Sequence, residues 1–136
     1  MDVSEPRLDV KPLYVKRDEG DDRWLVAWQV ANSSPRAVTI VSARLPHSRF
    51  RAEKTGFSTG ISVPADGRCE IILPARFRAA PDGVVENAFL ILSIKYEGLP
   101  WRIFARFRVN ANARGEPEPA IERITTQRVG FSGLGG

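Results

Sequence analysis

The clearest pattern in the chain is an alternation of large apolar residues with smaller or more polar ones over residues 23–31. One face would carry Trp24, Val26, Trp28 and Val30, and the other Leu25, Ala27, Gln29 and Ala31. A period of two over eight residues predicts a β-strand with one face in a core. The Asn32-Ser33-Ser34-Pro35 segment that follows predicts a turn.

The same period recurs along the chain and predicts an all-β fold. Further strands are expected over residues 8–16, 37–45, 69–73, 87–97 and 101–109. Residues 46–60 are expected to form a longer loop with room for a short strand around Phe57, which gives about seven strands. Segment 87–97 is apolar on both faces and is therefore expected at the centre. The predicted core includes Trp24, Trp28, Leu92, Ile94 and Phe107.

Three stretches carry a resemblance to a known fold: WLVAWQVANSSPRAVTIVSARLP, SVPADGRCEIILP and AFLILSIKYEGLPWRIFARFRV. A strand ends in Val30-Ala31-Asn32-Ser33, and a Pro-x-Gly-type turn, Pro64-Ala65-Asp66-Gly67, precedes another. In these features residues 8–110 resemble the immunoglobulin-like or fibronectin type III-like domains of bacterial proteins, without the paired cysteines of antibody domains. The resemblance implies an Ig-like two-sheet antiparallel sandwich, and it names no chemistry.

The last part of the chain has a different composition. Residues 110–119 contain two prolines and read as a linker. Residues 121–129 would either add a strand or remain extended. Residues 130–136 are rich in glycine and are expected to be a mobile tail. The predicted organisation is therefore an Ig-like sandwich over 1–110, followed by a linker and tail over 111–136.

Composition narrows the classes of protein. The chain has 136 residues, of which 43% are hydrophobic and 26% charged, so it can fold without a disulfide or a metal. No apolar run approaches the roughly 18 residues of a membrane-spanning helix, so no membrane insertion is expected. Residues 1–6 have neither a basic nor an apolar signal region. A single cysteine, Cys69, adds to the expectation of a reducing cytoplasm.

The sequence offers no catalytic or cofactor motif, so we expect a protein that is not an enzyme and needs no cofactor. His47 is the only histidine and lies in a predicted loop without a partner cluster. One histidine and one cysteine cannot build a common zinc site. Cys69 alternates with Ile71 and Leu73 and reads as a small buried apolar residue.

Basic residues are the stronger signal. Sixteen arginines stand against four lysines, and residues 23–114 hold 14 basic and 6 acidic groups. Arg102, Arg106 and Arg108 would project with Phe104 from one strand face, while Arg76 and Arg78 follow another strand. Such a face can meet an acidic protein surface or grip a phosphate backbone. It can also be a solvated face with cross-strand ion pairs to residues such as Glu70.

The glycine-rich tail offers two further interpretations. Phe131 and Leu134 could anchor a docking peptide, and the terminal Gly135-Gly136 resembles the diglycine of ubiquitin-like modifiers and sulfur carriers. The body of the chain departs from the ubiquitin pattern, because no helix-forming segment lies between its strands. We favour an interaction module or accessory subunit of a cytosolic assembly with an acidic protein partner. A nucleic-acid binder and a diglycine-tailed carrier remain as alternatives.

Overall fold

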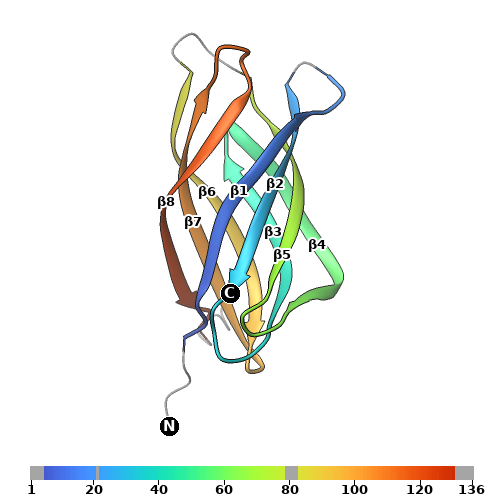
Figure 1. Cartoon of the computed structure of the whole chain (residues 1–136), viewed down its shortest axis with the longest axis vertical. Coiled ribbons are helices and arrows are strands. Elements are labelled where there is room, and N and C mark those ends of the chain that lie inside the picture. Colours follow the sequence, from blue (N-terminus) through green and yellow to red (C-terminus); the bar gives the residue numbers. More distant parts are fainter. Residues whose placement is uncertain (1–4, 21, 79–82, 131–136) are drawn as a thin grey trace.

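The structure is a computed structural model in which residues 5–20, 22–78 and 83–130 are described. Its elements are β1 (Leu8–Arg17), β2 (Arg23–Asn32), β3 (Val38–His47), β4 (Phe50–Val63), β5 (Arg68–Arg76), β6 (Val84–Tyr96), β7 (Leu99–Ala111) and β8 (Pro117–Arg128). These strands form one antiparallel sheet in the order β1-β2-β5-β4-β3-β6-β7-β8. The sheet curls until β1 comes close to β8, which gives a nearly closed barrel (Figure 1).

The prediction of an all-β fold is confirmed, but that of an Ig-like sandwich of seven strands in two sheets is wrong. The resemblance to immunoglobulin-like and fibronectin type III-like domains fails with it. The error lies in residues 46–60, because most of the predicted loop belongs to the 14-residue strand β4. This strand pairs with β3 along its length and with β5 at Arg51 and Arg76. It thereby joins two groups of strands into one sheet.

The junction between β4 and β5 is short. Arg51 and Arg76 are the only residues that pair across it among those the structure describes. The other side of β5 is fully paired, because residues 68–76 lie opposite 23–31 of β2. Past the Arg51–Arg76 pair, the barrel wall therefore opens between β4 and β5.

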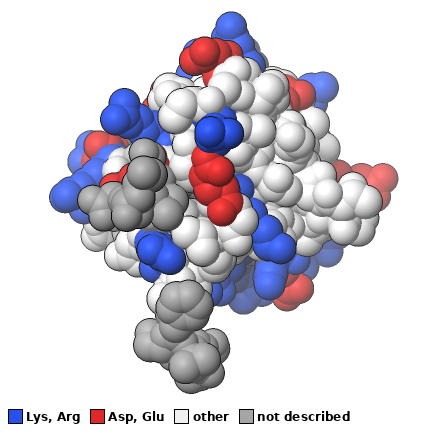
Figure 2. Space-filling model, turned by 90° about the horizontal axis from the view of Figure 1, so that it is seen from below, with Lys and Arg blue, Asp and Glu red and all other residues white. Residues whose placement is uncertain are grey.

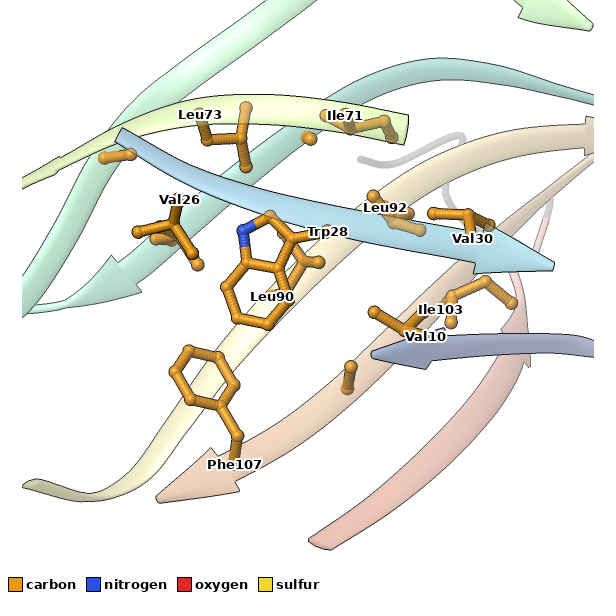
Figure 3. Packing of buried hydrophobic residues seen from close by; sticks show 14 of the residues in the cluster. Val10, Val26, Trp28, Val30, Ile71, Leu73, Leu90, Leu92, Ile103 and Phe107 are labelled. Atoms are coloured by element: carbon orange, nitrogen blue, oxygen red, sulfur yellow. The ribbon is translucent and has the colours of Figure 1, made fainter. Parts of the chain in front are cut away.

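The core fills the inside of the barrel. Trp28 is completely buried, and its ring centroid lies 5.1 Å from that of Phe107 (Figure 3). Phe50 packs edge-on against Phe107 and Phe77 at 5.5 and 5.9 Å. The five predicted core residues are all at most 2% exposed. Large aromatic side chains from several strands thus take the interior space that a flat sheet would leave open.

The two turn motifs named in the sequence lie together at the lower end of the barrel in Figure 1. The buried Asn32 side chain donates to the carbonyls of Arg36 and Val63 at 2.9 and 3.0 Å, and accepts from the Ser34 amide at 2.9 Å. Its backbone amide donates to the Gly67 carbonyl, and its carbonyl accepts from Asp66. Asn32 therefore ties the β2–β3 connection to the β4–β5 turn.

The segment from Asn110 to Pro119 forms a hairpin turn and the start of β8. The Asn112 side chain closes this turn, because its oxygen accepts from the amides of Arg114 and Glu116 at 2.9 and 3.0 Å. Residues 117–128 then pair with 101–111 of β7. The open question about residues 121–129 is thus answered up to Arg128, the last residue of β8.

Candidate functional site

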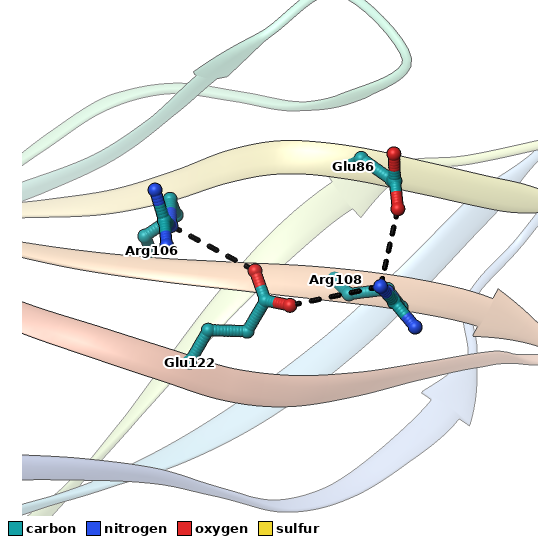
Figure 4. A network of polar contacts seen from close by, with 4 residues as sticks. All are labelled: Glu86, Arg106, Arg108 and Glu122. Atoms are coloured by element: carbon teal, nitrogen blue, oxygen red, sulfur yellow. Dashed lines mark hydrogen bonds and ion pairs between the residues drawn. The ribbon is translucent and has the colours of Figure 1, made fainter.

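The predicted basic face of β7 points outward, as its alternation implied. Two of its arginines, however, have acidic neighbours in Figure 4. Arg108 lies 3.1 Å from Glu86 on β6 and 3.9 Å from Glu122 on β8, and Arg106 lies 3.7 Å from the same Glu122. Phe104 is half-buried, with its ring edge-on to Phe89. Much of the charge on this face is therefore compensated within the protein, although by Glu86 and Glu122 and not by Glu70.

Arg102 differs from these two neighbours. It is exposed, and its cross-strand partners Ser93 and Gln127 carry no charge. Among the three arginines predicted as contact residues on this strand, Arg102 is thus the one with no acidic side chain at ion-pair distance among the described residues.

A second group of arginines belongs to strand ends and a turn that lie at the upper end of the barrel in Figure 1. Arg76 ends β5 and Arg78 follows it, while Arg49 and Arg51 come from the β3–β4 turn and the start of β4. Arg23 begins the neighbouring β2. We call these five the arginine cluster: Arg23, Arg49, Arg51, Arg76 and Arg78.

The strand register places three members of the arginine cluster side by side. Arg76 lies directly opposite Arg23 on β2 and directly opposite Arg51 on β4. All three are exposed and share the outer face of the sheet. Like charges on adjacent strands repel each other, so the arrangement reduces stability where it stands uncompensated.

No ion pair involves the arginine cluster within the described part of the chain. The ion pairs found there belong to Arg36, Arg106 and Arg108. Asp22 lies beside the cluster without forming an ion pair with it, and its backbone carbonyl accepts a hydrogen bond from the Phe77 amide at 2.8 Å. The cluster consequently has no acidic side chain at ion-pair distance among these residues.

Two open cavities border the arginine cluster. A cavity of about 540 Å³ is lined by four of its arginines together with Asp22, Ser48 and Phe77. A second, of about 400 Å³, extends along the opening between β4 and β5 and is lined by Arg23, Arg51, Lys54, Arg76 and the acidic Asp18 and Glu53, among others. Guanidinium groups at such a surface can each donate two parallel hydrogen bonds to a carboxylate or phosphate.

The opposite end of the barrel carries a different surface. Seen from below in Figure 2, basic and acidic side chains lie near one another, and a broad area is uncharged. Arg36 and Glu97 form an ion pair of 2.6 Å in this part of the fold. The arginine cluster at the other end has no such ion pair among the described residues.

The two candidates for reactive chemistry have ordinary surroundings. The Nδ1 atom of His47 accepts a hydrogen bond from the Arg49 amide at 3.0 Å within the β3–β4 turn. Burial raises the pKa of the Cys69 thiol, which keeps it protonated and unreactive near neutral pH.

No group of three His, Cys, Asp or Glu side chains suited to a metal occurs among residues 5–20, 22–78 and 83–130. Within the same ranges, no helix is long and apolar enough to span a bilayer.

The sequence placed Arg76 and Arg78 after a strand and Arg49 and Arg51 beside a loop, and it assigned all four to the basic surface, but it did not show that they lie together. The missing signal was the alternation in Phe50-Arg51-Ala52-Glu53, in which the apolar residues are buried and the charged ones exposed. Reading this alternation as a strand would have placed Arg51 on an outer face. The tail residues Phe131, Leu134, Gly135 and Gly136 lie outside the described residues.

Comparisons with known proteins add little to this description. No protein-family model matches the sequence, and no curated protein matches it. Among solved structures, the chain is similar to the X-ray structure of Northeast Structural Genomics Consortium target SoR45, at 10% identity and a TM-score of 0.32. The similarity covers 92% of this chain and 87% of that one. A likeness this weak carries no argument about fold or function.

Proposed function

We propose that this protein is a non-enzymatic interaction module that binds an acidic surface of a partner protein through the arginine cluster. The observation that carries the proposal is the row Arg23–Arg76–Arg51, in which three exposed arginines adjoin without an acidic partner among the described residues. A carboxylate placed between two of these side chains would accept charge-assisted hydrogen bonds from both. Binding would thus relieve a repulsion present in the free protein.

The surroundings of the cluster favour a protein over a nucleic acid. Stacking of bases needs exposed aromatic faces, but Phe77, the aromatic residue that lines the larger cavity, is only 3% exposed. Asp22 borders this cavity, and Asp18 and Glu53 border the second one. A phosphate backbone repels such carboxylates at every position, whereas a protein surface can present a basic group to each of them.

The test uses a synthetic eight-residue peptide of alternating aspartate and valine, with a fluorophore at one end. We expect it to bind the full chain at low salt and to be released as salt rises. The double variant Arg51→Gln/Arg76→Gln should weaken binding about tenfold or more, because each lost charge-assisted hydrogen bond contributes roughly 1.5–3 kcal/mol.

The matched control is Arg102→Gln/Arg128→Gln, which removes the same charge from exposed positions on β7 and β8. It should change affinity less than about twofold, since it leaves the cluster intact. Equal losses in both double variants would refute a specific site. Tighter binding of a 20-base-pair DNA duplex than of the peptide, with a steep salt dependence, would instead support the nucleic-acid alternative.

A further inference from the structure

The β5 edge that faces β4 is unpaired along most of its length. Two hydrogen bonds fix the pattern on the other side: the Phe77 amide donates to the Asp22 carbonyl, and the Asn32 amide donates to the Gly67 carbonyl, both at 2.8 Å. In an antiparallel ladder, every second residue exchanges hydrogen bonds with the same neighbour. Odd-numbered residues 67–77 therefore bond to β2, and the even-numbered ones direct their amides and carbonyls towards β4.

The even-numbered positions of β5 are Arg68, Glu70, Ile72, Pro74 and Arg76. Among the described residues, only Arg76 has a partner on this side, namely Arg51. Pro74 has no amide hydrogen, and its place in the alternation means that it removes no hydrogen bond from the β2 ladder. The amides and carbonyls of Glu70 and Ile72 face the opening without a paired strand.

The side chains at this edge are also accessible. Ile72 is 48% exposed, more than any other large apolar side chain in the described residues. The cavity of about 400 Å³ is lined by Pro74, Ala75 and Arg76 of β5 and by Arg51, Ala52 and Glu53 of β4, among others, so its β5 lining starts two residues after Ile72. The open backbone edge and the exposed Ile72 side chain therefore continue along β5 into the cavity that the arginine cluster borders.

We propose that the β5 edge binds an extended acidic segment of the partner protein by strand addition, in the antiparallel direction. This proposal rests on the proposed function, and it specifies the form of the partner. The segment would pair with Glu70 and Ile72, and a carboxylate at its end nearest Arg76 would lie beside Arg76 and Arg51, whose own pairing closes the edge there. Backbone hydrogen bonds would supply affinity, and the acidic residue nearest Arg76 would supply specificity.

Charge decides the occupant. The groove carries Arg23, Arg51, Lys54 and Arg76 against Asp18 and Glu53, and the open part of the β5 edge adds Arg68 and Glu70, which leaves a net positive charge. A second copy of this edge would bring its own arginines against the first, so like charges disfavour self-pairing. A neutral strand would leave the repulsion in the arginine cluster in place. An acidic segment is therefore the occupant that the groove best complements.

The decisive variant is Ile72→Pro, because it removes an amide from the open edge while all β2 hydrogen bonds remain. It should weaken binding of the aspartate–valine peptide about tenfold, compared with Ile72→Thr, which keeps the amide and also shortens the apolar side chain. A matching melting temperature for both variants would show that the fold survives. Equal affinity of these two variants would overturn strand addition.

N-methylated peptides test the same point on the unmodified protein, in case Ile72→Pro does not fold. In antiparallel addition, the aspartates that share the outer face with Arg76 also direct their amides to β5. N-methylation of the aspartates should abolish binding, and N-methylation of the valines should leave it within about twofold. The reverse result, or equal binding by both peptides, would overturn the antiparallel proposal.

These outcomes separate the two proposals. If both methylated peptides bind as well as the parent and Arg51→Gln/Arg76→Gln still weakens binding, the arginine cluster acts through side chains alone and the strand proposal fails. If the parent peptide shows no dependence on the cluster, the proposed function fails first.

Discussion

Arg76 offers the most direct test of the idea that the cluster sacrifices stability for binding. Replacing it with glutamate converts two like-charged cross-strand pairs, with Arg23 and Arg51, into two opposite-charged pairs. We expect Arg76→Glu to raise the free energy of unfolding while it abolishes binding of the acidic peptide. An ordinary surface substitution would change neither quantity much.

The magnitude follows from the register. A directly opposed pair of charged residues contributes roughly 0.2–1 kcal/mol, with the sign set by the charges. Two repulsions are removed and two attractions are gained, but all three side chains are exposed and screened by solvent. We therefore expect a gain of about 1–2 kcal/mol at low salt, which corresponds to roughly 3–6 °C in melting temperature for a chain of this size.

Thermal and urea unfolding at low salt would measure this gain, and repetition at 1 M salt should remove most of it. Arg76→Gln should recover about half, because it ends the repulsion without adding attraction. Arg102→Glu is the control, since its cross-strand neighbours Ser93 and Gln127 are uncharged. A loss of stability in Arg76→Glu, or an equal gain in Arg102→Glu, would refute the assigned register and the repulsion derived from it.

Three further predictions concern the fold. Trp28→Ala should lower the free energy of unfolding by about 3–5 kcal/mol, since it empties a buried site against Phe107; an unchanged urea midpoint would contradict the core described here. Asn32→Ala should cost about 2–3 kcal/mol by leaving buried carbonyls unpaired, whereas Ser33→Ala, at an exposed site, should be nearly neutral in the same urea titration. Cys69 should react with iodoacetamide more slowly than free cysteine between pH 8 and 9, because its raised pKa leaves less thiolate there; equal rates would contradict its burial.

Most of the strands could be predicted because they are half-buried and alternate cleanly. In β2 the buried Trp24, Val26, Trp28 and Val30 face the core, as their period of two requires. Segment 87–97 was expected at the centre because it is apolar on both faces; β6 is indeed flanked on both sides, by β3 and β7, but it is sixth of eight in the strand order. Burial of alternate residues is a local property, so the sequence carries it directly.

The barrel could not be predicted, because it depends on β4. Arg51, Glu53 and Lys54 make the start of this strand highly charged, and Gly56 and Gly60 weaken its alternation further on. The structure accommodates this with a large irregularity, in which Ile40 and Ser42 of β3 pair with Ile61 and Gly56 of β4. The composition of β4 does not favour a strand, and its pairing with β3 holds it in this conformation. Such a strand is hard to recognise from the sequence alone.

The basic site was half predicted for a related reason. Arg76 and Arg78 could be recognised as charges at the end of a strand. Their position beside Arg51, however, depends on a pairing between residues that lie 25 positions apart in the sequence. The β7 face gave the stronger signal in the sequence, because Arg102, Arg106 and Arg108 share one face of a single strand. Only the register of β8 shows that Glu122 lies between Arg106 and Arg108 and compensates them. The number of charged residues can be read from the sequence, but whether a positive charge is neutralised depends on which strands pair.

The short β4–β5 junction and the arginine cluster have one physical explanation in common. Arg51 and Arg76 form the only pair between these strands in the described chain, and it joins two like charges. Each further pair would add backbone hydrogen bonds, but the chain instead leaves Glu70 and Ile72 open beside an unneutralised positive surface. Opening of this kind costs stability and is usually retained where a partner later supplies the missing contacts. An acidic strand would supply both at once: hydrogen bonds to the edge and carboxylates to the arginines. The shortest pairing between neighbouring strands of the sheet is therefore a place where binding can add contacts.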